Sequence, residues 1–66
     1  MGAPPQMTLA RWLKADGDTV WRGQAICEIE SDSANVEVEA WTDGVLRHLV
    51  REGERIHDRT LVARIE

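Results

Sequence analysis

The sequence predicts an all-β domain in which two copies of one strand unit stack as facing sheets about a pseudo-twofold axis. Three features support this fold class. β-Branched residues are frequent, and most apolar residues are spaced two apart rather than three or four apart. Glycines separate the apolar segments, as turns between strands require. The third feature is an internal repeat that spans most of the chain.

The repeat becomes visible when the chain is shifted by 36 residues, which aligns residues 11–30 with residues 47–66. Each copy begins with a strand, passes through a turn closed by Gly17 or Gly53, and continues into a short and then a longer alternating strand. The matched pairs include Arg11 with Arg47, Leu13 with Leu49, Gly17 with Gly53, Val20 with Ile56, and Ile29 with Ile65.

One such unit cannot bury its apolar face alone, so we expect the two copies to share a core. The core candidates are the inward positions of the predicted strands: Leu13, Val20, Ile26, Ile29, Val36, Val38, Leu46, Leu49, Ile56, Leu61 and Ile65. A slip of one residue would exchange some of these for Val45, Val50 or Val62, because successive side chains of a strand point to opposite faces.

The segment 28–40 predicts a β-hairpin with its tip at residues 31–34. Apolar residues alternate on both sides of this tip, and the glutamates take mostly the opposite, solvent face: Glu28, Glu30, Glu37 and Glu39. A hairpin tip presents a side chain to solvent on a rigid support, and Ser33 is the central residue of this one. The pattern therefore predicts an exposed side chain at position 33.

The length of 66 residues indicates one domain, which we assign to residues 1–66 with a loose N-terminal segment at residues 1–7. The chain has 12 acidic and 8 basic residues and a net charge of −4, which argues against binding to nucleic acid or to an anionic membrane. We therefore expect protein partners, and a monomer or weak homo-oligomer.

The single cysteine, Cys27, cannot form an internal disulfide, and we expect it to pack as a small hydrophobe in its strand. No apolar run approaches the ~20 residues that cross a bilayer, and the start of the chain lacks the features of a secretory signal. These observations predict a cytoplasmic location.

An ordered set of motifs then resembles the lipoyl and biotinyl carrier domains, and the lipoyl-type domain of 2-oxo acid dehydrogenase acyltransferases in particular. No single motif is diagnostic, but their order over most of the chain is a specific signal. The matching segments are WLK at 12–14, GDTV at 17–20, Gly23, EIESDSA at 28–34, VEV at 36–38, DGVL at 43–46 and EGERI at 52–56.

The resemblance implies a flattened β-barrel of two four-stranded antiparallel sheets, the barrel-sandwich hybrid, with a lysine at the hairpin tip that carries lipoate through an amide. The attachment turn corresponds here to Asp32, Ser33 and Ala34, so a serine stands at the lysine position. A serine cannot supply the amine for that amide, and we expect no covalent cofactor on this chain. Biotin is disfavoured further, since neither Met1 nor Met7 flanks the turn.

Three other departures from the pattern affect the expected partners. Lys14 is the only lysine, and we interpret it as a solvent-facing strand residue rather than a second attachment site. The segment before Trp12 is shorter than the usual family start, which implies a truncated or reshaped loop beside the tip. Trp41 stands where the family commonly has proline, and alternation places Trp21 at the surface, so these two indoles either cap the core or form a partner surface.

Catalytic and metal chemistry find little support. His48 and His57 match no compact zinc spacing with Cys27 or Asp58, so we expect surface histidines and no metal site. A serine such as Ser33 on a hairpin tip lacks the base and the oxyanion pocket of a nucleophile. The sequence therefore predicts a protein that is not an enzyme.

Three hypotheses for the function follow. The first is a lipoyl-like domain without lipoate that acts as a structural or protein-interaction module, with subunits of a 2-oxo acid dehydrogenase complex as possible partners. The second is an acyl-carrying lipoyl domain whose lysine has been replaced in this chain by engineering. The third is a small self-associating β-module that buries Trp21 and Trp41 against a symmetry mate.

Overall fold

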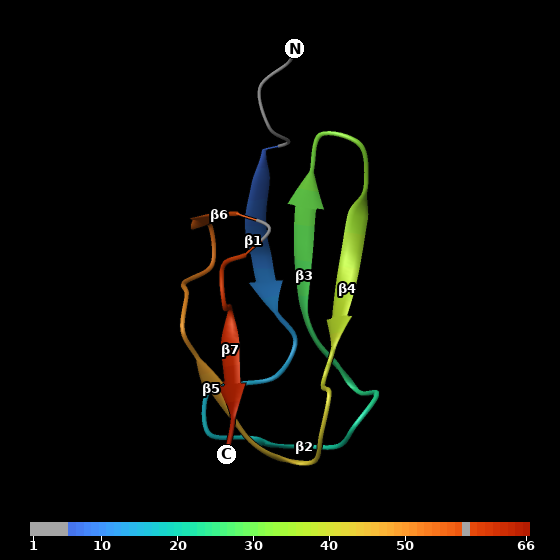
Figure 1. The fold of residues 1–66 in the computed structure, drawn as a ribbon, viewed down its shortest axis with the longest axis vertical. Helices are drawn as coiled ribbons and strands as arrows, with labels where there is room; N and C mark the ends of the chain where they lie inside the picture. Colours follow the sequence, from blue (N-terminus) through green and yellow to red (C-terminus); the bar gives the residue numbers. More distant parts are fainter. Residues whose placement is uncertain (1–5, 58) are drawn as a thin grey trace.

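The described part of the chain folds entirely into strands and turns. A computed structural model describes residues 6–57 and 59–66, and the seven strands in these residues confirm the predicted all-β class (Figure 1). The strands are β1 (Met7–Trp12), β2 (Thr19–Val20), β3 (Ala25–Ser31), β4 (Asn35–Glu39), β5 (Gly44–His48), β6 (Arg55–Ile56) and β7 (Ala63–Ile65). The described residues contain no helix that could cross a membrane.

The strands form two antiparallel sheets, as predicted, with the orders β4-β3-β1-β6 and β2-β5-β7. The expectation of four strands in each sheet is wrong for the second, which has three among the described residues. β1 begins at Met7, inside the segment expected to be loose, and residues 1–5 of that segment lie outside the described residues.

Backbone hydrogen bonds join the two copies of the repeat in a reciprocal way. The N–H of Leu46 in β5 donates to the carbonyl of Asp18, at 2.8 Å, in the turn of the first copy. The N–H of Leu9 in β1 donates to the carbonyl of Glu54, at 3.0 Å, in the matching turn of the second copy. Each turn is thus fastened to the first strand of the other copy, which is the pseudo-twofold arrangement that the repeat predicts.

The shared core lies between the sheets and follows the predicted pattern in part. It consists of Leu9, Val20, Ile26, Cys27, Ala40, Leu46, Val50, Ile56 and Ala63, with Met7, Trp12, Ile29, Val38, Val62 and Ile65 packed against it. Cys27 is buried among these residues, as expected. Leu49 and Leu61 were core candidates and are exposed, because the chain is shifted by one residue there, so that Val50 and Val62 point inward instead.

Val36 is also exposed, at 56%, which corrects its assignment to the core. It pairs with Ile29 in the half of the β3–β4 hairpin that leads to the tip. Figure 1 shows this half of the hairpin extending beyond β2, β5 and β7, so the second sheet does not cover it. The inner face of a hairpin stays exposed wherever no second layer lies opposite.

Glycine is required for a steric reason where β5 meets the end of the chain. Gly44 has a φ of +152°, and a Cβ there would overlap the backbone carbonyl oxygen of Glu66 and lie 2.8 Å from Ile65 Cγ2. Gly53 has a similarly positive φ of +84°, but a Cβ there would meet nothing within 4 Å. A side chain at Gly53 would therefore add backbone strain alone, whereas one at Gly44 would add backbone strain and a steric clash.

We predict that Gly44→Ala lowers the free energy of unfolding by about 2 kcal/mol or more, because β7 must move away from β5. The matched control, Gly53→Ala, suffers only the strain of a positive φ and should cost about 1 kcal/mol. Urea unfolding followed by tryptophan fluorescence measures both. Equal losses in the two variants would contradict the close approach of Gly44 and Glu66.

Candidate functional site

The predicted hairpin tip is a tight turn between β3 and β4. Ile29 pairs with Val36, and the next pair toward the tip is Glu30 with Asn35. The hydroxyl of Ser31 donates to the carbonyl of Ala34 at 2.8 Å and accepts from the Ala34 N–H at 3.2 Å, while the Ser31 N–H donates to the same carbonyl at 3.0 Å. The serine at the start of the turn thus closes it with local hydrogen bonds.

The structure brings Asp32, Ser33 and Ala34 together at this tip, and all three are exposed. Ser33 therefore projects from the end of the hairpin, at the place where the resemblance puts an attachment lysine. Amide linkage of a lipoyl group needs a side-chain amine, and the Ser33 hydroxyl does not provide one. The residues of the turn do not fit a covalently held lipoyl group.

Lys14 does not provide an alternative amine at the hairpin tip. It lies in a bend after β1, not on a strand as predicted, and it is half-buried rather than fully exposed. Met7, at the first end of β1, pairs with Ser31 beside the tip, whereas Trp12 at the other end pairs with Cys27. Lys14 therefore lies past the end of β1 that points away from the tip.

The two surface tryptophans lie on loops that the backbone joins together. Trp21 follows β2 and Trp41 follows β4, and their side chains are 60% and 50% exposed. The N–H of Gly23 donates to the carbonyl of Ala40, and the N–H of Ala40 donates to the carbonyl of Gln24, both at 2.8 Å. These loops lie at the opposite end of the β3–β4 hairpin from its tip (Figure 1).

A third site, which the sequence interpretation missed, lies on the pseudo-twofold axis. The Trp12 and His48 rings are stacked, with centroids 3.7 Å apart and planes 8° apart. The indole N–H of Trp12 donates to the carbonyl of Val50 at 3.2 Å, and His48 Nε2 lies 2.9 Å from the carbonyl of Lys14. The 36-residue shift pairs Trp12 with His48 and Lys14 with Val50, so the repeat contained the signal for this contact.

The prediction of two surface histidines is therefore wrong for His48, which is half-buried, and correct for His57, which is exposed. Two carboxylates complete the symmetry of the stacked pair. Glu52 accepts from the backbone N–H of Trp12 at 2.8 Å, and Asp16 accepts from the backbone N–H of His48 at 2.7 Å. The stacked rings thus hold the two copies of the repeat together at the point where their chains cross.

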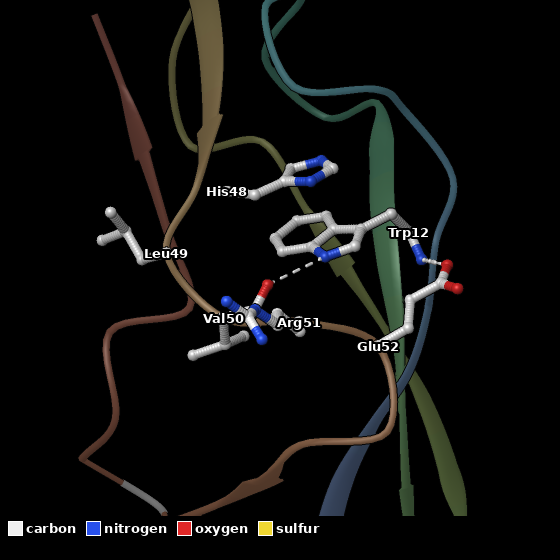
Figure 2. Close-up of a pocket in the computed structure, with 6 residues that line it drawn as sticks. All are labelled: Trp12, His48, Leu49, Val50, Arg51 and Glu52. Carbon is white, nitrogen blue, oxygen red and sulfur yellow. Dashed lines mark hydrogen bonds between the residues drawn. The ribbon is translucent and has the colours of Figure 1, made fainter.

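An open hollow of about 420 Å³ lies beside the stacked rings. Figure 2 shows the side chains that line it, with Trp12 and His48 face to face and Glu52 turned toward the Trp12 backbone. The remaining lining residues are Leu49, Val50 and Arg51. Because the Trp12 indole N–H and His48 Nε2 already bond to backbone carbonyls, we interpret the stacked pair as a support of the fold rather than a reactive site.

The described side chains form neither a metal centre nor a reactive thiol. Within residues 6–57 and 59–66, no three His, Cys, Asp or Glu residues come together as metal ligands. Asp58, one of the ligands weighed from the sequence, lies outside the described residues. Burial raises the pKa of the Cys27 thiol from 9.0 to about 11, so the thiol stays protonated and unreactive at neutral pH.

A barrel-sandwich of two repeated β-units, with a tight hairpin that projects the residue between an Asp and an Ala, defines the class of carrier-type attachment domains. The chain belongs to the biotin/lipoyl family: the family model described as "Biotin-requiring enzyme" matches residues 1–65.

The relatives identify the lipoyl branch. The chain is 47% identical over 51 residues to the dihydrolipoyllysine-residue acetyltransferase component 2 of the pyruvate dehydrogenase complex from Arabidopsis thaliana, covering 73% of this chain and 10% of that protein. It is 53% identical over 49 residues to the acetyltransferase component from Rickettsia felis, covering 70% of this chain and 12% of the relative. It is also 46% identical over 59 residues to the succinyltransferase component of the 2-oxoglutarate dehydrogenase complex from Haemophilus influenzae, covering 88% of this chain and 14% of that protein. The chain thus spans about a tenth of the length of these relatives.

We predict that His48→Ala lowers the free energy of unfolding by about 1–2 kcal/mol, because the stack with Trp12 and the hydrogen bond to Lys14 are lost. The control is His57→Ala, which removes an exposed histidine and should change stability by less than about 0.5 kcal/mol. Thermal denaturation followed by circular dichroism distinguishes the two variants, and equal melting temperatures would contradict the role of the stacked pair.

The raised pKa of Cys27 also predicts a pH dependence of stability. Below pH 9.0 the thiol is protonated in the folded and unfolded chain alike, so its contribution is fully present. As the pH rises from 9.0 toward 11, the unfolded chain ionises first, and stability should fall by on the order of 2 kcal/mol. Urea midpoints at pH 8 and pH 10.5 test this, and Cys27→Ala should remove most of the slope. If the pH dependence of stability is unchanged in Cys27→Ala, it arises from other titratable groups.

Proposed function

We propose that this domain is a lipoyl-like module that carries no lipoate and acts as a non-catalytic structural or protein-interaction element, within or derived from a 2-oxo acid dehydrogenase acyltransferase. One observation carries the proposal: the exposed tip holds Ser33 where the lipoyl branch of the family has its attachment lysine. The scaffold around that residue is retained while the group that would be acylated is absent.

The chemistry of the tip supports this proposal. A ligase that forms an amide needs a nucleophilic nitrogen at the end of a flexible side chain, whereas Ser33 offers a hydroxyl close to the backbone. An ester at that position would also lack the reach of a lysine-linked arm. The neighbours Asp32 and Ala34 are exposed beside it and supply no amine.

The partner that this proposal favours is a subunit of a 2-oxo acid dehydrogenase complex. The relatives with 46–53% identity are components of the pyruvate and 2-oxoglutarate dehydrogenase complexes. A domain that keeps this surface without the cofactor could occupy a position in such an assembly without transferring an acyl group. Localisation with the assembly would follow from that partner.

A second candidate role is protein binding through Trp21 and Trp41. Their exposures of 60% and 50% favour a contact surface over the alternative in which both rings cap the core. Large indoles that remain in water on a small domain are frequent anchors of protein interfaces. This surface lies away from the hairpin tip, so the two roles do not exclude each other.

The rival hypothesis is a functional carrier domain whose lysine has been replaced in this chain. The test is to co-express Ser33→Lys with a lipoate ligase and lipoate, and to measure the intact mass. The wild-type chain should show no lipoyl increment, because Lys14 is half-buried and lies away from the tip. An increment on the variant would show that the ligase still recognises this surface and would favour the rival, whereas no increment would favour a long-diverged, unmodified module.

Two control variants locate any modification. Asn35→Lys places a lysine two residues along the same exposed hairpin and should stay unmodified if recognition depends on position 33. Adding Lys14→Arg to Ser33→Lys leaves a single lysine, so an increment retained there assigns the adduct to position 33. An adduct on the wild-type chain would refute the proposal.

A further inference from the structure

The loops that hold Trp21 and Trp41 are fixed by hydrogen bonds, although both indoles are exposed. The N–H of Trp21 donates to Gln24 Oε1 at 3.1 Å, and the Gln24 N–H donates back to the Trp21 carbonyl at 2.9 Å. Asp43, two residues after Trp41, ties the second loop to the first, because its Oδ1 accepts from the N–H of Arg22 at 2.8 Å. A partner that contacts the two indoles therefore has to order little more than the rings themselves.

The fold makes no use of these two rings. Neither belongs to the described residues that form the core or pack against it. The third tryptophan shows the contrast, since Trp12 packs against the core, stacks on His48 and donates its indole N–H to the carbonyl of Val50. The apolar area of Trp21 and Trp41 is therefore left for contact with another molecule.

The segment that carries both indoles is strongly acidic. Residues 15–46 include eight acidic residues and a single basic one, Arg22, whereas the remaining residues include four acidic and seven basic ones. Within the part of the chain that the structure describes, salt bridges from arginines reach only two of the eight acidic residues, Asp16 and Glu28. The charge of this chain is thus divided unevenly, and the indoles lie on its negative part.

Two of the acidic residues lie next to the indoles. Glu39 and Asp43 flank Trp41 at two residues on either side, and both are exposed. The carboxylate of Asp43 also contacts the loop of Trp21, through its hydrogen bond to the residue that follows this tryptophan. Arg22 offsets one of the two negative charges and leaves the other. The surface around the rings is therefore apolar and negatively charged.

This combination matches the chemistry of an arginine side chain. A cation over an indole face is attracted by the ring quadrupole, and a carboxylate beside the ring attracts the same cation. A planar guanidinium can stack on the ring while its N–H groups bond to the carboxylate, which a lysine ammonium does less well. A second copy of this chain would instead bring one acidic surface against another, so the charges argue against self-association here.

From this complementarity we infer that the surface formed by Trp21, Trp41, Glu39 and Asp43 binds a basic, arginine-containing segment of another protein. The inference rests on the second role proposed above, protein binding through the two tryptophans, and it adds the chemistry of the partner. Arginine side chains of that segment stack on the indoles and pair with the two carboxylates. The hairpin tip, at the other end of β3 and β4, stays outside this contact (Figure 1).

The test is a nuclear magnetic resonance titration of the isotopically labelled full chain, followed by its indole N–H signals. The probes are four short synthetic peptides in which glycine alternates with arginine, lysine, glutamate or proline. The arginine peptide should shift the Trp21 and Trp41 signals to saturation and bind about threefold more tightly than the lysine peptide. The glutamate and proline peptides should leave both signals in place. Trp12, whose indole N–H is bonded to Val50, is the internal reference and should not move.

Charge variants locate the contact. Glu39→Gln combined with Asp43→Asn removes both charges but keeps an amide oxygen that can accept from Arg22, so the loops stay joined. This double variant should bind the arginine peptide at least about fivefold more weakly. The control is Glu30→Gln, which removes an exposed glutamate near the hairpin tip and should leave the affinity unchanged. Trp41→Ser, followed by the Trp21 signal, should also weaken binding about fivefold.

The outcomes separate this inference from the role on which it rests. If the proline or glutamate peptide shifts the two indole signals as strongly as the arginine peptide, the surface binds peptides but the basic partner is wrong. Shifts that grow with protein concentration in the absence of peptide would assign the surface to a second copy and overturn the inference. An affinity for the arginine peptide that the double charge variant retains would overturn it too. Signals that none of the four peptides moves would count against both the inference and the binding role of the tryptophans.

Discussion

The reciprocal hydrogen bonds between turn and strand are the constraint on which the rest of this small domain depends. Leu9 is fastened to the turn at Glu54 and Leu46 to the turn at Asp18, so neither copy of the repeat can complete its sheet without the other. A chain of 66 residues buries too little apolar surface to keep two separate cores. Intertwining the copies gives one shared core, and the stacked Trp12 and His48 fix the crossing point.

The two copies of the repeat differ in the strands that their described residues form. The first copy has β4, so its hairpin extends past the second sheet and holds Ser33 in solvent, at the cost of an exposed Val36. The second copy has no matching strand among the described residues.

Under the function proposed above, this domain is a carrier scaffold that persists without its reactive group. The hairpin tip is stabilised by Ser31 and by the β3–β4 ladder, and neither depends on which side chain occupies position 33. Under that proposal, a serine at position 33 removes the acylation chemistry without removing any of the contacts that hold the tip. The exposed tryptophans at the far end of the hairpin offer a binding function that such a scaffold could retain.

The sequence by itself determined the fold class, the repeat, the hairpin with its tip at residues 31–34, and the serine at its centre, because each depends on local spacing and on residue identity. It also narrowed the core to alternating positions, but it could not choose between Leu49 and Val50, or between Leu61 and Val62. Only the tertiary structure decided those registers, the strand count of the second sheet, and the contact of Trp12 with His48. Each of these depends on which surface lies opposite, and a linear pattern does not specify that.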